Sequence, residues 1–214
     1  MIHNTQKTTF GLLAVAGATL IGGGVWSLKP QAAIAAAPAG KSAPSFTLKD
    51  TMGRTRSLSQ FKGRYVVMEW LNHDCPFVKA QYAGGNMQKL QRAARSKGAV
   101  WLSIASSASG KQGHYNGSQA NALTRSKKAM PSAVLLDASG KVGRLYGAKT
   151  SPHMFVINPQ GKVIYNGALD NNPTTDQASV PGATNYVMAA LTQAKKGQKV
   201  SLAATQPYGC SIKY

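Results

Sequence analysis

The sequence predicts an α/β domain of three layers with a mixed central sheet, preceded by a cleavable N-terminal signal segment. Two observations predict this class. Short apolar runs, which suit strands covered on both faces, alternate along the chain with segments of helical periodicity. Their order is strand, helix, strand, helix, followed by a hairpin and a closing helix. The 214 residues provide for one domain of ordinary size with an N-terminal segment and a tail.

Residues 1–35 have the pattern of a secretory signal peptide. Lys7 precedes an apolar stretch at residues 10–26, and small residues surround Ala35, near which we expect cleavage. An uncleaved membrane anchor is the alternative, because this stretch is close to the lower length limit for a spanning helix. Three consecutive glycines within it weaken such a helix. Either interpretation places the folded part outside the cytoplasm, in the periplasm or another extracytoplasmic space.

The start of the folded domain follows from composition. Residues 36–45 are rich in Ala, Pro and Ser, so we expect a linker there and a folded domain at residues 46–214. The domain ends in a tail, residues 198–214. Residues 45–48 alternate in polarity as a short strand does, and a turn leads from them to a second short strand at residues 55–58.

The central sheet is predicted from short, mostly apolar runs. Four such runs are the expected strands, at residues 65–70, 100–104, 133–136 and 154–157. Residues 158–161 have Pro and Gly where a type I turn takes them. They therefore join the last of these strands to a hairpin partner at residues 163–165.

Helices are expected between these strands and after them. Between the first two strands, apolar side chains recur on one helical face and basic side chains point elsewhere, and Gly84-Gly85 separates this helix from the turn after Cys75. The apolar face consists of Met87, Leu90 and Ala94. Residues 119–130 can form a second helix. The closing helix has an apolar face formed by Val187, Ala190, Leu191 and Ala194 and ends at residues 195–197.

Cys75 is the first candidate for chemistry, because it follows a buried strand in the polar loop Asn72-His73-Asp74-Cys75-Pro76. Pro76 suits the first position of a helix, since it has no amide hydrogen to leave unpaired. Cys75 is then expected at the positive end of that helix, where the reactive thiolate is favoured, although Asp74 opposes it. Alternatively, Cys75 is a small buried apolar residue. His73 either donates to the sulfur or is a solvated loop residue.

These residues resemble the thioredoxin superfamily, in which a strand and a loop lead to Cys-Pro at a helix start. Residues 72–79 and 86–91 are similar to its redoxin branch, the alkyl hydroperoxide reductase and thiol-specific antioxidant group. The resemblance extends from about Gly40 to the C-terminal tail. It implies a thioredoxin fold and a peroxiredoxin-like thiol chemistry that needs no cofactor.

The resemblance implies roles for two further residues. Glu69, six residues before Cys75, matches a buried carboxylate of many thioredoxins and would be a proton acceptor whose pKa burial raises. Alternation along the strand would instead turn Glu69 toward solvent. Pro152 matches a cis-proline that leaves backbone groups open to pair with an extended peptide or thiol substrate. His153 would then flank the site, or is a residue at a strand edge.

Departures from the family bear on the activity. The second cysteine of a Cys-x-x-Cys motif is replaced by Val78, so no resolving thiol lies next to Cys75. Peroxidatic redoxins usually carry Thr three residues before the cysteine, Pro seven residues before it and an arginine near the late strand. This chain has Asn72, Met68 and Pro152 at these places. The absence of the usual Thr, Pro and arginine counts against a fast peroxidase.

Cys210, four residues from the end, is the second cysteine of the chain. An oxidising compartment permits Cys75 and Cys210 to pair, either as an inert structural staple or as a redox couple that cycles. The resemblance implies that the Cys75 thiolate attacks a disulfide or a peroxide and that Cys210 resolves the product.

The expected function is therefore that of an exported thiol oxidoreductase of the redoxin type. Its expected partners are a thiol or disulfide substrate or a peroxide, and an unidentified reducing partner. A thiol peroxidase is the alternative within enzymes. A metal-binding or envelope protein with a structural disulfide is the alternative outside them. The metal alternative would use Cys75, His73, His153 and Cys210, but their spacing matches no short metal motif, so no metal is expected.

The charge of the chain predicts an affinity for anions. The 25 basic and 6 acidic residues give a net charge of +19, which falls to +17 without Lys7 and Lys29 of the signal segment. Such a field attracts anionic partners, and an anionic envelope surface is the candidate. The chain has no arginine-rich run, zinc motif or nucleic-acid module, so no specific nucleic acid is expected.

Overall fold

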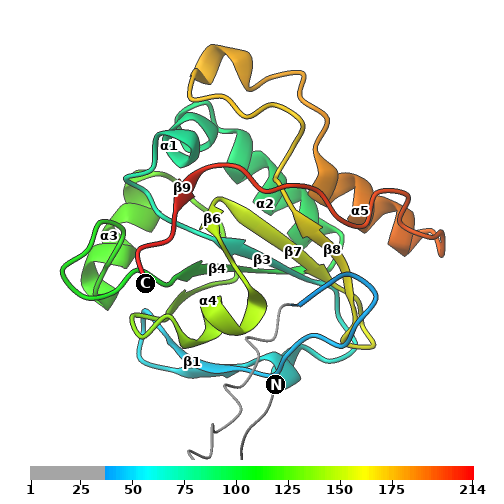
Figure 1. Cartoon of the computed structure of the whole chain (residues 1–214), viewed down its shortest axis with the longest axis horizontal. Helices are drawn as coiled ribbons and strands as arrows, with labels where there is room; N and C mark the ends of the chain where they lie inside the picture. The colour runs from blue at the N-terminus through cyan, green and yellow to red at the C-terminus, as the bar shows by residue number, and fades with distance from the viewer. Residues whose placement is uncertain (1–36) are drawn as a thin grey trace, which may run out of the picture. The chain divides into compact units, whose positions relative to one another are not determined.

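The computed structural model describes residues 37–214, which form a mixed sheet with helices on both faces (Figure 1). The predicted signal segment, residues 1–35, lies outside the described residues. The seven-stranded sheet has the order β2-β1-β5-β4-β3-β7-β8. Its strands are β1 (Thr47–Asp50), β2 (Thr55–Ser57), β3 (Val66–Trp70), β4 (Val100–Ala105), β5 (Ala133–Leu136), β7 (His153–Ile157) and β8 (Val163–Gly167). β3, β4 and β5 are parallel, and the other pairings are antiparallel.

In the part of the chain that the structure describes, five α-helices connect and cover these strands: α1 (Pro76–Ala83), α2 (Asn86–Ser96), α3 (Gly117–Ser126), α4 (Lys141–Tyr146) and α5 (Tyr186–Lys195). Two 3₁₀ turns, η1 (Leu58–Phe61) and η2 (Gln177–Ser179), complete the connections. α1, α2 and α5 pack on one face of the sheet, and α4 with the first described residues packs on the other. The predicted three-layer α/β fold is confirmed.

Alternation along β3 divides the interior into two clusters. Val67 belongs to the cluster under α1, α2 and α5, together with Leu71 and Cys75. Met68 and Trp70 point to the opposite face and belong to the cluster under α4. All five residues of β3 are buried, as expected for a strand covered on both faces.

Two elements of the fold were not expected from the sequence. α4 is only six residues long and is bounded by Gly140 and Gly147, both in the left-handed conformation. A separate two-stranded sheet pairs β6 (Thr150–Ser151) with β9 (Cys210–Ser211). Neither is long enough to show a hydrophobic period.

The residues predicted as a linker lie against the domain. Ala37 is buried and its amide donates to the Tyr146 carbonyl at 3.2 Å. Gly40 donates to the Val163 carbonyl at 2.7 Å, and Ser42 pairs with Lys162. Within residues 37–214, no helix is both long and apolar enough to cross a membrane.

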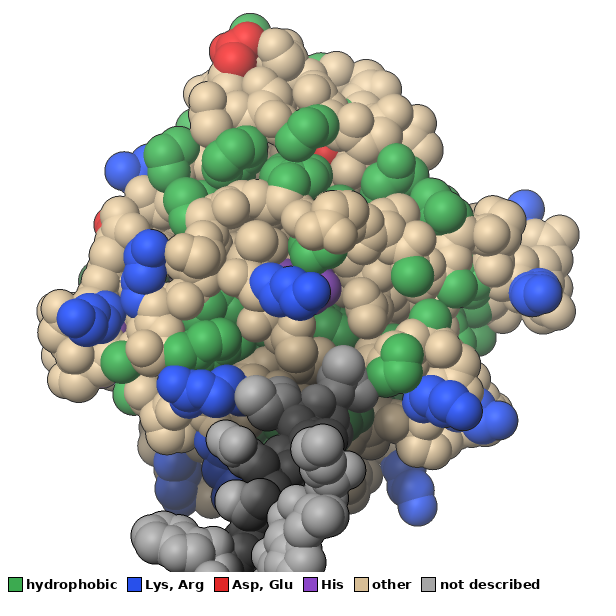
Figure 2. Space-filling view, in the orientation of Figure 1, with side chains coloured by type: hydrophobic (Ala, Val, Ile, Leu, Met, Phe, Trp, Pro, Cys, Tyr) green, Lys and Arg blue, Asp and Glu red, His purple; other side chains and the backbone are tan. Residues whose placement is uncertain are grey.

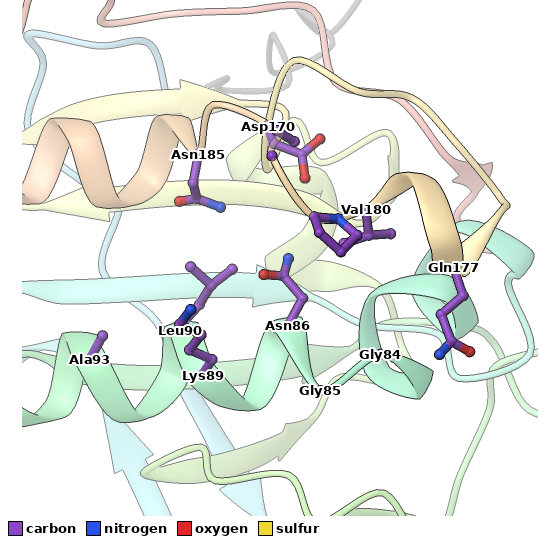
Figure 3. A pocket seen from close by; sticks show the side chains of 13 residues that line it. Gly84, Gly85, Asn86, Lys89, Leu90, Ala93, Asp170, Gln177, Val180 and Asn185 are labelled. Carbon is purple, nitrogen blue, oxygen red and sulfur yellow. The ribbon is translucent and has the colours of Figure 1, made fainter.

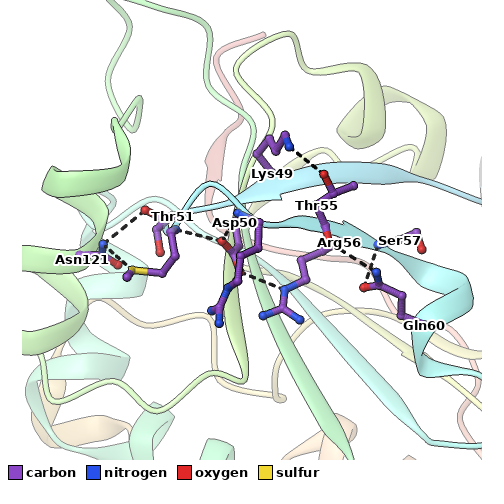
Figure 4. A network of polar contacts seen from close by, with 10 residues as sticks. Lys49, Asp50, Thr51, Thr55, Arg56, Ser57, Gln60 and Asn121 are labelled. Atoms are coloured by element: carbon purple, nitrogen blue, oxygen red, sulfur yellow. Dashed lines mark hydrogen bonds and ion pairs between the residues drawn. The ribbon is translucent and has the colours of Figure 1, made fainter.

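The β1–β2 hairpin is fixed by a buried carboxylate (Figure 4). Asp50 accepts hydrogen bonds from Nε of Arg54 and of Arg56, each at 2.9 Å, and from the Met52 amide at 2.9 Å. Burial works to raise the pKa of Asp50, but the hydrogen bonds from Arg56 and from the turn hold it below its usual value. The hairpin therefore closes this edge of the sheet with an internally neutralised charge.

Candidate active site

Cys75 lies at the N-terminus of α1, where Pro76 occupies the first turn, as predicted. Its side chain is fully buried in the cluster under α1, α2 and α5. The thiol donates to the Ser151 carbonyl at 3.1 Å, and the sulfur accepts from the Cys210 amide at 3.4 Å. Two backbone groups, from segments far away in the sequence, thus meet at this sulfur.

The Ser151–Pro152 peptide bond is cis, as predicted. Ser151 ends the short strand β6, which pairs antiparallel with β9 so that Ser151 is opposite Cys210. The edge that the sequence predicted to be open for an extended peptide is therefore occupied by the chain's own tail.

The tail crosses the sheet from the end of α5 to the beginning of α1 (Figure 1). Thr205 Oγ1 accepts from the Ala168 amide at 2.9 Å. Further along, the hydroxyl of Tyr208 donates to Asp170 Oδ1 at 2.6 Å, and its ring packs on Phe77 with the ring centroids 5.7 Å apart. The Ile212 amide then donates to the Lys149 carbonyl at 3.1 Å. These contacts hold Cys210 beside Cys75.

Cys75 and Cys210 are both free thiols and lie close enough to exchange a disulfide. The Cys210 amide nitrogen is 3.4 Å from Cys75 Sγ, so the Cα of Cys210 lies within about 5 Å of that sulfur. Burial raises the pKa of the Cys210 thiol to about 11, and its hydrogen bond to Cys75 and the charge of Cys75 act in the same direction. Cys210 is therefore held as a protonated thiol at neutral pH.

Glu69 is fully buried, which rules out the solvent-facing alternative. Its Oε2 accepts from Trp101 Nε1 and Ser103 Oγ, both at 2.8 Å, and its Oε1 accepts from Tyr82 Oη at 2.9 Å. Burial raises the pKa of Glu69, and these donors oppose the rise. The hydrogen bonds to Glu69 do not include Cys75, so its role as a proton acceptor stays a prediction.

The Asn72 and His73 side chains are arranged around Tyr115 rather than around the sulfur. Asn72 Oδ1 accepts from the Asp74 amide at 2.9 Å and from Tyr115 Oη at 3.2 Å. His73 is buried, with its ring 5.1 Å from that of Tyr82 and 6.1 Å from that of Tyr115. Burial, aided by the charge of Lys127, lowers the pKa of His73 to about 4. Both expectations for His73 are corrected, since it is neither solvated nor bonded to Cys75.

His153 lies on the opposite face of the sheet from Cys75. Its ring packs on Phe155 with centroids 4.7 Å apart, and its Nδ1 accepts from the Lys149 amide at 3.1 Å. Burial lowers the pKa of His153 to about 4. Because the side chains of β7 alternate, a residue in line with Phe155 cannot face the cluster of Cys75. This position corrects the prediction that His153 flanks the site.

The side chains proposed as an alternative metal site do not come together. Within residues 37–214, no group of three or more His, Cys, Asp or Glu side chains could hold a metal ion. His153 is separated from Cys75 by the sheet, and the rings of His73 and Tyr82 are in contact. The donor set that the metal alternative requires is therefore not assembled.

Asp170, Tyr208 and Ser151 were not identified from the sequence. Asp170 is buried and accepts from Gln81 Nε2 of α1 at 3.0 Å as well as from Tyr208, so it ties the tail to the helix that begins at Cys75. A pocket of about 400 Å³ lies beside Asp170, between the start of α2 and the loop before α5 (Figure 3). The sequence offers one signal for Asp170, which is that the chain has only six acidic residues. An acidic side chain is rarely buried without a partner, so each of the six is a candidate for a structural role.

Comparison with known families agrees with this arrangement. The family model described as Redoxin matches residues 38–187, which include Cys75 and the cis-proline but not the tail. The chain belongs to the redoxin family. It is a thioredoxin-fold protein of redoxin type, as its sequence resemblance implied. No curated protein matches the chain.

Solved structures resemble this redoxin over most of its length. An uncharacterised conserved protein from Geobacillus kaustophilus has a TM-score of 0.73 and 25% identity, with 83% of this chain and 93% of that one covered. A hypothetical protein from Sinorhizobium meliloti has a TM-score of 0.72 and 22% identity, with 82% and 94% covered. A putative thiol:disulfide interchange protein from Chlorobium tepidum has a TM-score of 0.49 and 25% identity, with 60% and 83% covered.

Proposed function

We propose that this redoxin is a thiol:disulfide oxidoreductase in which Cys75 is the nucleophile and Cys210 the resolving cysteine. The observation that carries the proposal is the 3.4 Å contact between the Cys210 amide and Cys75 Sγ, which the β6–β9 pairing maintains. The elevated pKa of Cys210 supports the assignment of the first attack to Cys75, because a protonated thiol is a poor nucleophile.

The reaction proceeds by two exchanges. The Cys75 thiolate attacks one sulfur of a substrate disulfide; a mixed disulfide forms, and the departing substrate thiolate takes up a proton. Cys210 then gives up its proton and attacks Cys75 Sγ. A Cys75–Cys210 disulfide forms and the second substrate thiol leaves. Two electrons have passed to the substrate, and an external dithiol restores the pair by the reverse exchange.

A thiol peroxidase is the second candidate, and the contacts of Cys75 favour it less. That reaction would convert the Cys75 thiolate and a peroxide to a sulfenic acid and an alcohol or water, and Cys210 would condense with the product. It needs donors aimed at the departing oxyanion. Within the described residues, the hydrogen-bond partners of the sulfur are the Ser151 carbonyl and the amide and thiol of Cys210.

We also propose that the protein acts outside the cytoplasm at an anionic envelope surface. The signal-peptide pattern predicted for residues 1–35 supports the location. Four of the six acidic residues, Asp50, Glu69, Asp137 and Asp170, are buried, which leaves Asp74 and Asp176 exposed. Lysine and arginine side chains are spread over the face in Figure 2. A surface with so few negative charges attracts polyanions through charge alone, without specificity for a particular polymer.

The redox potential of the cysteine pair tests the proposed reaction. Mass spectrometry of the alkylated mature protein across a series of thiol buffers should give one two-electron midpoint, on the order of −120 to −270 mV. Cys75→Ser and Cys210→Ser should each abolish the intramolecular disulfide, and alkylation of Cys75 should abolish thiol turnover. A disulfide that resists reduction below about −300 mV would identify a structural staple instead. Failure to form any intramolecular disulfide would also contradict the proposal.

A further inference from the structure

With the tail in place, Cys75 has no access to a substrate. Cys75 is 0% exposed, although the proposed reaction requires another sulfur to approach it in line. The groups that contact the sulfur on the side of the tail are the Cys210 amide and the carbonyl of Ser151, to which Cys210 is paired. Access to Cys75 therefore depends on whether β9 stays in place.

We propose that residues 208–211 are a displaceable occupant of the β6 edge. Tyr208 holds them in place, and Gly209 allows them to approach the edge closely. The partner that displaces them is an extended polypeptide segment carrying a cysteine. The identity of this partner rests on the proposed function, whereas the displacement of the tail does not. While the tail is docked it shields Cys75 and presents Cys210, and when it leaves, the same edge is open to the partner.

The pairing of β9 with β6 is suited to replacement. It consists of two antiparallel residue pairs, Thr150 with Ser211 and Ser151 with Cys210. Main-chain pairing on a strand edge does not depend on side chains, so an extended segment of another protein can form the same bonds. A sheet of two residues per strand is also a small unit, and small peripheral units open locally at far lower cost than the central sheet.

Tyr208 is the side chain that holds the occupant in place. Its hydroxyl donates to the buried carboxylate of Asp170 at 2.6 Å, and its ring packs on Phe77, two residues after Cys75. Asp170 also accepts from Gln81 of α1. These contacts hold the tail against α1, the helix that positions the reactive sulfur. They lie next to the β6–β9 backbone pairing, which must open for Cys75 to become accessible.

Gly209 permits the close fit between the tail and the edge. It has a φ of +126°, and a Cβ at this position would overlap the Ser151 carbonyl and lie 3.1 Å from the Pro152 nitrogen. Gly209→Ala therefore cannot dock as the glycine does. Gly182 is a matched control, because it has a φ of +90° but nothing within 4 Å of an added Cβ. Gly182→Ala therefore introduces backbone strain without a contact at the β6 edge.

Alkylation of Cys75 in a Cys210→Ser background tests the displacement directly. Cys75 is then the only thiol, so no disulfide complicates the rate of reaction with iodoacetamide. Tyr208→Phe should raise the rate about ten-fold, since it removes a hydrogen bond to a charged group, and Gly209→Ala should raise it further. Gly182→Ala should leave it unchanged. Equal rates in all four proteins would overturn the proposal.

Hydrogen exchange of the unaltered protein gives a second measurement that needs no variant to fold. The amides of Cys210 and Ile212 should exchange at least about a hundred-fold faster than those of β7, through opening of the tail alone. Exchange of both sets at the same protected rate would mean that the tail leaves only on global unfolding, and would refute displacement. Neither measurement requires turnover, so a failure of the redox reaction and a failure of tail displacement are distinguished.

Discussion

Acid should destabilise the folded protein through its two buried histidines. His73 and His153 have pKa values of about 4 in the folded state, against 6.5 in the unfolded chain. Their neutral forms are therefore favoured by folding. Between pH 6.5 and 4 the unfolded chain binds more protons than the folded protein, so the stability present above pH 6.5 is lost as the pH falls toward 4.

The expected loss can be worked from these values. Between pH 7 and pH 5, each histidine should cost about 2 kcal/mol of unfolding free energy, so the two together should cost about 4 kcal/mol. That is a large part of the roughly 5–15 kcal/mol that stabilises a typical domain. Glu69 opposes this trend, because its raised pKa lets the folded state take up a proton as the pH falls toward 4.5.

Variants that keep the packing isolate the histidine contribution. His153→Asn retains an acceptor for the Lys149 amide, and His73→Phe retains a ring against Tyr82. Urea denaturation at pH 7 and pH 5 should show that each variant loses about 2 kcal/mol less than the unaltered protein. The contribution of Glu69 cancels in this difference. If both variants lose as much as the unaltered protein, the assignment of the acid sensitivity to these histidines is wrong.

Two further substitutions probe the anchoring of the tail and the buried carboxylate. Thr205→Val should cost about 1–3 kcal/mol in urea denaturation, because the buried Ala168 amide loses its acceptor and the Tyr165 hydroxyl keeps only the Ala168 carbonyl of its two partners. Thr205→Ser, which keeps the hydroxyl, should cost less, and equal costs would refute the reasoning. Ser103→Ala should destabilise more at pH 8 than at pH 5, because Ser103 donates to Glu69 and the charged carboxylate needs the donor most. The exposed Ser96→Ala is its control, and a cost for Ser103→Ala that does not vary with pH would contradict the prediction.

The parts of the structure that the sequence predicted correctly depend on local chemistry. Pro76 fixes the start of α1 because it needs no partner for an amide hydrogen, and this places Cys75 at the helix N-terminus. Gly84 and Gly85 end α1 and begin α2, with Gly85 in the left-handed conformation. In each case the neighbouring residues alone determine the backbone, so no distant contact had to be known.

The parts that the sequence left open depend on which face of the sheet is covered. Alternation put Glu69 on one face of β3 and Trp70 on the other, but it did not tell which face meets solvent. The structure covers both, since α2 contributes Gln91 and β4 contributes Trp101 to the environment of Glu69. The surroundings of His73 and His153 were hidden for the same reason, because the ring of Tyr115, 42 positions along the chain, packs near His73 and Phe155 of the opposite core packs on His153.

The tail shows why two interpretations of Cys75 that seemed to exclude each other are both correct. From the sequence, a buried cysteine in an apolar cluster and a reactive cysteine at a helix N-terminus are alternatives, because a reactive thiol has to be reached. Cys75 is in both situations, since it caps the start of α1 and is buried in the apolar cluster beside β9, whose register brings Cys210 opposite Ser151. Burial that comes from a two-residue strand can be reversed at far less cost than burial by the sheet. If the tail is displaced as proposed, the shielding of Cys75 depends on β9, while its place at the start of α1 stays the same.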